Sequence, residues 1–403
     1  MAEQTVFPTP ARTVEKLLAG SREGYWTWEL LTHDPTTGRD RLAGYLAGVT
    51  TGNLHQAYNQ PVRVSGQISV DDLPVDPPGQ IAFRNANAGT ALTRLRPVYH
   101  IKGVPGFNGA DLAMPQSVHL FTAHPETHDD TGTTITVDLL DKTTVLQQDA
   151  ITSVYTADTT TPVLQIIAAI ITSAGEHIDV DTADLTRLAN PKIWPVATSK
   201  LAIINDLCDI IGYQHLQTTP AGDFIVTPQI APTARPRRFD TIDLAKVLSD
   251  AATTMYLTGW TRDLDNWNVP NRVICPENDQ PTDDGNDPLV GLAENHDPTS
   301  PYSIEKQGRA VTETLSPQDM PDGLSPVERQ TRLDTAATQS LTAYSARAST
   351  IELSCLPMPW WNSDVLQFSN QSADVDGLYQ ISLIDFDAAE NGLMKLTMQE
   401  VLT

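Results

Sequence analysis

Hydrophobic and polar positions alternate along most of the first third of the chain, as they do in half-buried β-strands. Residues 25–31 and 62–70 show the alternation, and the turn-forming sequence Asp-Pro-Thr-Thr-Gly occupies 34–38. Short strands separated by Gly, Pro and Asp turns favour a barrel or a sandwich. Further strands are expected at 96–101, 117–123 and 133–140.

The pattern becomes helical after residue 157. Residues 162–171 are apolar nearly all round, with Pro162 expected in the first turn and Gly175 after the end, which predicts a buried helix. Apolar residues recur at steps of three and four over 199–211, between an N-cap Ser199 and Gly212. We expect the two helices to pack together through these side chains: Leu201, Ile204, Leu207, Cys208 and Ile211 against Val163, Ile166, Ile167, Ile170 and Ile171. A hairpin turn and strand are expected at 221–228.

Strand patterns return near the end of the chain. Before them, Ser-Pro-Val-Glu at 325–328 is a capping-box start and predicts a helix over about 325–346. The 403 residues exceed the roughly 250–300 at which single cores stop growing, so several domains are expected. We predict a first β domain at 1–157, an α/β domain at 158–232 and a second β domain at 233–403. The last strands are expected at 350–356, 364–369, 378–385 and 392–401.

Charge and cysteine content narrow the function classes. With 50 acidic and 26 basic residues the formal charge is −24, which argues against tight binding to nucleic acid or anionic membranes. Three widely spaced cysteines, Cys208, Cys275 and Cys355, exclude a disulfide scaffold and suit a reducing cytoplasm. No signal peptide is evident, and the longest apolar stretch, 163–171, is shorter than a membrane span.

Two polar segments are interpreted as connectors. The Pro- and Arg-containing stretch 231–238 suits an extended linker better than a nucleic-acid arm, because aromatic residues are not interleaved with its arginines. The acidic stretch 276–288 lacks the ligand order of an EF-hand loop and is interrupted by Pro281. We therefore expect a mobile surface loop there rather than a calcium site.

The search for chemistry yields no predicted catalytic, cofactor-binding or metal-binding residue. A histidine-rich stretch fits no zinc motif and is interpreted as a polar turn between two strands. The pair Trp360-Trp361 suits a sugar-stacking platform, but a Pro-Trp turn that covers a barrel end is commoner. No nucleophile elbow, P-loop or dinucleotide-binding motif is present. The histidine-rich stretch consists of His119, His124, His128, Asp129 and Asp130.

Longer segments carry more information through their joint order along 25–401. Examples are Arg-Pro-Val-Tyr-His-Ile-Lys-Gly at 96–103 and Trp-Pro-Val-Ala-Thr-Ser-Lys-Leu at 194–201. In order and spacing the series resembles tail hub proteins of long-tailed actinobacterial phages, often labelled minor tail proteins. The sequence departs from the pattern at Val196, where Gly is expected, and in a longer 103–114 segment. The remaining matching segments are 137–149, 202–207, 212–213, 222–224, 269–273, 295–304, 308–309, 357–359, 364–365, 377–379 and 393–396.

The resemblance implies two hub-type split β-barrel domains that flank a smaller α/β domain. It implies a homotrimer that forms a pseudo-sixfold ring at the tail tip, in contact with the distal tail protein, the tape-measure protein and tip or fibre proteins. Genomic DNA would touch the ring only in transit. This role is structural, without cofactor or enzymatic activity, in a virion protein made in the host cytoplasm. The alternatives are a receptor- or glycan-binding tail protein and a tail-associated cell-wall hydrolase.

Overall fold

The computed structural model resolves the chain into two compact units. The large unit is Met1–Trp260 with Glu352–Asp376 and Gln380–Thr397, and the small unit is Thr261–Ile351 with Gly377–Tyr379 and Met398–Thr403. The predicted linker and most of the acidic stretch lie outside the described residues. Within the described part no helix is long and apolar enough to cross a membrane. The structure describes residues 23–57, 63–105, 111–129, 132–230, 248–249, 256–263, 267–277, 289–315, 324–345, 349–389 and 392–401.

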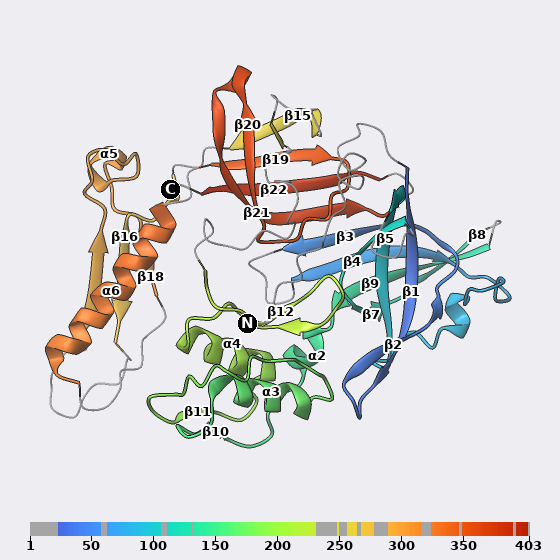
Figure 1. Ribbon diagram of the computed structural model, residues 1–403, viewed down its shortest axis with the longest axis horizontal. Coiled ribbons are helices and arrows are strands. Elements are labelled where there is room, and N and C mark those ends of the chain that lie inside the picture. The colour runs from blue at the N-terminus through green and yellow to red at the C-terminus, as the bar shows by residue number, and fades with distance from the viewer. Residues whose placement is uncertain are drawn as a thin grey trace. The chain divides into compact units, whose positions relative to one another are not determined.

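One large sheet dominates the structure (Figure 1). Its longest path runs β15-β19-β22-β21-β3-β4-β9-β7-β5-β1-β2, and β6, β8, β14 and β20 pair beside it. The strands are β1 (Gly24–Asp34), β2 (Arg39–Tyr45), β3 (Val49–Ala57), β4 (Val64–Asp71), β5 (Thr93–Pro105), β6 (Asp111–Pro115), β7 (His119–Ala123), β8 (Glu126–Asp129), β9 (Gly132–Asp141), β14 (Leu248–Ser249), β15 (Tyr256–Asp263), β19 (Thr350–Cys355), β20 (Val365–Asn370), β21 (Val375–Asp387) and β22 (Met394–Val401).

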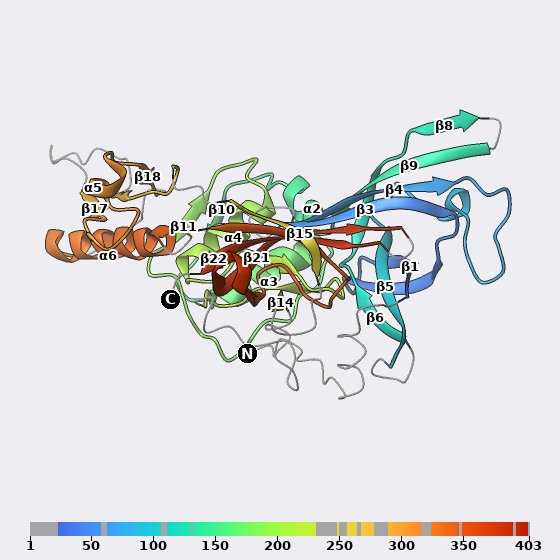
Figure 2. The same ribbon diagram turned by 90° about the horizontal axis from the view of Figure 1, so that it is seen from above.

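The mainly β prediction is confirmed. Among the described strands the path begins at β15 and ends at β2, and these two end strands do not pair with each other. The described strands therefore form one open path, and the expected pair of split β-barrels stays a prediction. Figure 2 shows β3, β4 and β9, three neighbours on this path, running side by side.

The first and last parts of the chain meet at the pairing of β3 with β21. The strands run antiparallel from Asn53 opposite Asp387 to Ala57 opposite Leu383. His55 Nδ1 lies 2.5 Å from Asp385 Oδ1 across this pair. The ring of Trp26, on β1, meets the ring of Phe386 edge-on at 6.0 Å.

An α/β module interrupts the sheet between β9 and β14; we call residues 142–230 the middle module. Its helices are α2 (Thr143–Gln148), α3 (Val163–Ser173) and α4 (Lys200–Ile210), and its short strands are β10 (Tyr155–Ala157), β11 (Lys192–Trp194), β12 (Gln217–Thr218) and β13 (Phe224–Ile225). Both predicted helices are confirmed, whereas the sequence did not reveal α2. Pro162 is the N-cap of α3 rather than a residue of its first turn, because its ψ of 136° is not helical.

The predicted packing of α3 on α4 is also confirmed. Ser199 caps α4, since its hydroxyl accepts a hydrogen bond from the Ala202 N–H at 3.2 Å, and Gly212 follows the helix with a φ of +69°. Ile203 is fully buried as well, although the predicted stripe omitted it. The shared core includes Val163, Ile166, Ile167, Ile170, Ile171, Leu201, Ile203, Ile204, Leu207 and Cys208.

The small unit is a three-stranded sheet covered by a helix. The strands β17 (Val290–Glu294), β16 (Arg272–Pro276) and β18 (Thr312–Thr314) lie in that order, and α6 (Pro326–Ser345) packs on one face; the short helix α5 is Ile304–Gln307. The predicted capping box of α6 is confirmed: the Ser325 N–H donates to Glu328 Oε2 at 2.8 Å, and the Glu328 N–H donates to Ser325 Oγ at 3.3 Å.

Candidate functional site

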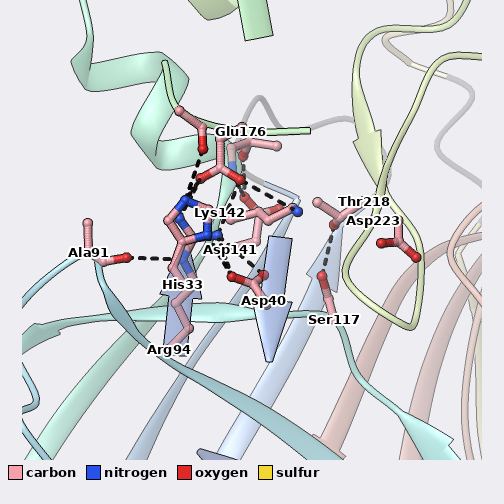
Figure 3. Close-up of polar contacts among 12 residues, drawn as sticks. His33, Asp40, Ala91, Arg94, Ser117, Asp141, Lys142, Glu176, Thr218 and Asp223 are labelled. Atoms are coloured by element: carbon pink, nitrogen blue, oxygen red, sulfur yellow. Dashed lines mark hydrogen bonds and ion pairs between the residues drawn. The ribbon is translucent and has the colours of Figure 1, made fainter. Parts of the chain in front are cut away.

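A cluster of buried charged side chains joins the middle module to the strands of the large unit (Figure 3). Arg94, on β5, is 1% exposed, and the side chain of Glu176, directly after α3, is fully buried. We call this cluster the charged joint. It consists of His33, Asp40, Arg94, Asp141, Lys142 and Glu176.

The end of α3 determines where Glu176 lies. Gly175 has a φ of +78°, and its N–H donates to the Thr172 carbonyl while the Glu176 N–H donates to the Ile171 carbonyl. This is a Schellman ending, for which glycine is preferred because other residues are strained at positive φ. The reversal of the chain directs the Glu176 side chain towards β1, β2 and β5 (Figure 3).

Arg94 is the centre of the charged joint. Its Nη2 donates to Glu176 Oε1, and its Nη1 donates to Glu176 Oε2 at 3.2 Å, so the pair is bidentate. Nη1 also lies 3.1 Å from Asp40 Oδ1 on β2, and Nε donates to the Ala91 carbonyl at 3.1 Å. Every nitrogen of this buried guanidinium therefore has an acceptor.

Lys142 and His33 complete the charged joint. Lys142 Nζ lies 3.7 Å from Glu176 Oε2 and 4.4 Å from the centre of the Phe224 ring. Burial lowers the pKa of Lys142, and the charges of Glu176 and Asp40 oppose this change. His33 contacts Asp40 on one side and the Gly175 carbonyl on the other.

Two carboxyl groups of the charged joint have opposite pKa shifts. Burial raises the pKa of Asp141 to about 6, against the hydrogen bonds that it accepts from Thr143 and the Val64 N–H. Burial also favours the neutral form of Asp40, but the hydrogen bond from His33 and the positive charges of Arg94 and Lys142 outweigh it and lower the pKa of Asp40. Asp40 is therefore ionised at neutral pH.

A second, uncharged contact holds the β12–β13 hairpin. Ser117, between β6 and β7, donates through Oγ to Thr218 Oγ1 at 2.9 Å and through its N–H to the Pro220 carbonyl at 2.8 Å. Ser117 is itself in the left-handed region, with a φ of +67°. A Cβ at Gly222 would lie 2.2 Å from Val118 Cγ2, so the hairpin backbone passes too close for a side chain.

The charged joint suits attachment rather than catalysis. The charges of Asp40, Arg94, Lys142 and Glu176 are largely buried and pair with one another rather than with a ligand. Asp141 instead accepts hydrogen bonds from Thr143 and the Val64 N–H. It fixes the end of α3 and the start of α2 against three strands at once. The arrangement therefore determines how the middle module is held on the sheet.

The histidine-rich stretch is not brought together. His119 lies in β7 and is fully buried, so the expectation of a turn is wrong for this residue; burial lowers its pKa to about 4. His124 and His128 are exposed, and His128 Nδ1 lies 2.8 Å from Thr133 Oγ1. Asp129 belongs to β8, and Asp130 lies outside the described residues. Among the described residues no group of three such side chains is placed to hold a metal.

The tryptophan pair and the cysteines are buried. Trp360 and Trp361 are each 4% exposed, so neither ring offers a face on which a sugar could stack. This removes the sequence feature that best supported a glycan-binding role. Cys208, Cys275 and Cys355 are buried thiols that are not joined in disulfides, and they pack as small apolar residues do.

Sequence reasoning did not single out any residue of the charged joint. Gly175 was recognised as a helix end, and that signal also predicts a chain reversal at Glu176. The partner Arg94 lies 82 residues away and carries no local signal, because its neighbours form an ordinary strand pattern.

Two solved structures share the fold over nearly the whole chain. A tail protein from Neisseria meningitidis MC58 is 10% identical, with a TM-score of 0.53 over 93% of this chain and 97% of that chain. The 43 kDa tail protein of prophage MuSo2 from Shewanella oneidensis is 12% identical, with a TM-score of 0.56 over 93% of this chain and 98% of that chain. No protein-family model and no curated protein matches the sequence. The chain therefore has the fold of these two tail proteins, while the resemblance to hub proteins of actinobacterial phages stays a prediction.

Proposed function

We propose that the chain is a structural tail protein of a phage, and that it is the hub of the tail tip. The supporting observation is the fold that it shares with two tail proteins over 93% of its length. Three copies would form a pseudo-sixfold ring between the tail tube with its distal tail ring and the tip or fibre proteins. The tape-measure protein would lie inside the ring, and DNA would pass through it.

The pairing of β3 with β21 suits this role. It places strands from the first and last parts of the chain side by side in one sheet, as two ring-forming halves of one protomer require. We retain the three-part division at 1–157, 158–232 and 233–403 for the proposed hub, with the charged joint holding the middle part outside the ring plane. The net charge of −24 favours free passage of DNA, because Lys and Arg contacts to phosphate are scarce.

The role that we propose is not enzymatic, because both neighbours in fold are tail proteins. Purified full-length protein is expected to leave host cell walls intact in a zymogram. A clearing zone that disappears on substitution of a single Asp or Glu would instead support the hydrolase alternative.

A cryo-EM map of the tail tip tests the ring. We expect three copies of the chain around the tail axis, each with two similar β portions in the plane of the ring. A map with one copy at that level, or with six identical copies, contradicts the proposal. Light scattering on the purified chain is the companion measurement, since a hub trimerises at sufficient concentration.

A further inference from the structure

The small unit contains an edge strand of the kind that natural sheets usually protect. Among the described strands β17 pairs only with β16, so the other side of its backbone faces no strand. The side chains of Val290 and Leu292 are 45% and 50% exposed, because they alternate with Gly291 and Ala293, which face α6. An edge that combines open backbone groups with exposed apolar side chains is a template for pairing with another chain.

Two side chains of α6 occupy this edge. Gln330 Nε2 donates to the Val290 carbonyl at 2.9 Å, and the Leu292 N–H donates to Asp334 Oδ1 at 3.3 Å. Gln330 Nε2 also donates to Asp334 Oδ1 at 2.9 Å, which joins the two side chains. Both partners of Nε2 are acceptors, so they fix the orientation of the Gln330 amide. The helix runs beside β17 in Figure 2.

The two hydrogen bonds to β17 follow the pattern of a parallel strand. In a parallel pair, one residue donates to the carbonyl that precedes the opposite residue and accepts from the N–H that follows it. Gln330 and Asp334 do this on either side of Gly291. The helix approaches so closely because Gly291 has no side chain, since a Cβ there would lie 2.3 Å from the backbone of Leu333.

We propose that Gln330 and Asp334 form an edge plug, whose role is to keep β17 from pairing with β17 of a second copy. The strand is a suitable partner for itself, because an antiparallel, twofold contact sets Val290 and Leu292 of each copy beside those of the other. Such a contact satisfies the same backbone groups that the plug satisfies. A twofold contact has no place in a threefold ring, but the inference does not depend on that ring.

Removal of the edge plug from the full-length chain tests the proposal. In Gln330→Ala/Asp334→Ala we expect self-association, measured by analytical ultracentrifugation, at a roughly tenfold lower concentration than in the wild type, because the plug no longer competes for the edge. Thr331→Ala/Thr335→Ala is the matched control, since these exposed residues of α6 have the same spacing and donate to carbonyls of the helix itself. The control is expected to behave like the wild type. A double variant Gln330→Ala/Asp334→Ala that associates no more readily than the wild type overturns the proposal.

Two further variants identify the surface and its chemistry. Leu292→Lys, added to the double variant, should abolish the extra association, because a lysine on an edge strand opposes pairing. Association that persists in this triple variant runs through another surface and overturns the proposal. Asp334→Asn keeps an acceptor oxygen, so we expect it to match the wild type. If it associates as readily as the double variant, charge repulsion rather than hydrogen bonding protects the edge, and the plug is wrong.

Hydrogen exchange follows the edge plug at a single amide. At a protein concentration below that of self-association, the Leu292 N–H should exchange roughly tenfold faster in Asp334→Ala than in the wild type, because its acceptor is lost. The Ala293 N–H lies on the side of the strand that pairs with β16, so it is the internal control and should be unchanged. Equal exchange of Leu292 in the two proteins overturns the proposal. If the double variant does not fold, this measurement on the single variant decides.

Discussion

The buried pair of Arg94 and Glu176 allows a quantitative test of the charged joint. In Arg94→Met the carboxylate of Glu176 stays fully buried but loses its bidentate partner, and only Lys142 at 3.7 Å remains as a cation near it. Removing one member of a buried ion pair typically costs 3–5 kcal/mol, and the remaining Lys142 places the expected loss near the lower limit, at about 3 kcal/mol. Glu176→Met is expected to lower the stability by a similar amount, because it leaves the buried cations Arg94 and Lys142 with only the carboxylate of Asp40.

The double variant Arg94→Met/Glu176→Met removes both charges together. Lys142 and Asp40 then still balance each other, and the new apolar side chains fill much of the same volume. We expect the free energy of unfolding to return to within about 1–2 kcal/mol of the wild type, as buried ion pairs replaced by apolar residues often do.

Urea unfolding of the purified chain measures these changes in the free energy of unfolding. Arg96→Met is the matched control, because the ion pair of Arg96 with Glu29 is partly exposed, and it should cost about 1 kcal/mol or less. If the double variant is as unstable as the sum of the two single variants, the side chains do not act as a pair and the reasoning is wrong.

Three further changes test other parts of the structure by urea unfolding. Ile204 lies in the core of the middle module, so Ile204→Ala should lower the free energy of unfolding by roughly 2–5 kcal/mol and Ile204→Asp by more. Ile210 is 48% exposed, so Ile210→Ala should change the stability little. Equal effects at the two positions would place Ile204 at the surface. Gly291→Ala should destabilise the small unit, because the new Cβ would lie 2.3 Å from the backbone of α6. Gly259→Ala is the control and should be tolerated, since no atom lies within 4 Å of its Cβ. A Gly291→Ala variant as stable as the wild type contradicts the close packing. Since burial lowers the pKa of His119 from 6.5 to about 4, the neutral ring contributes stability that is present above pH 6.5 and is lost as the pH falls towards 4. In His119→Phe the stability lost between pH 6.5 and 4.5 should be smaller by roughly 2 kcal/mol than in the wild type. An unchanged slope of stability against pH would exclude His119 as the source of that loss.

Local signals in the sequence predicted the three longest described helices, α3, α4 and α6. Ser199 and Gly212 enclose a periodic apolar stripe, and both act in the structure as their residue types suggest. The Ser325–Glu328 capping box identified the start of α6 in the same way. Caps and periodicity involve residues only a few positions apart, so a sequence shows them directly.

Contacts between distant residues could not be predicted in this way. Strand β3 mixes Thr, Gly, Asn, His and Gln and shows no clean alternation, yet Gln56 in it is fully buried. The burial of His119 depends on its pairing with Asp141 on β9 and with Leu95 on β5, which is a property of the sheet topology. The charged joint was missed for the same reason, since its members come from separate elements whose own patterns are ordinary.

The pairing of β3 with β21 has a consequence for the timing of folding. His55 and Asp385, which face each other across it, are 330 residues apart in the chain. At synthesis rates of about 5–20 residues per second, β3 waits roughly 16–66 s on the ribosome before its second neighbour exists. The middle module depends on contacts much closer in sequence and can form during that interval, whereas the main sheet is completed only after nearly the whole chain has been made. A truncated chain that ends before β21 should therefore leave one edge of β3 open to other strands, which makes premature termination a direct route to aggregation.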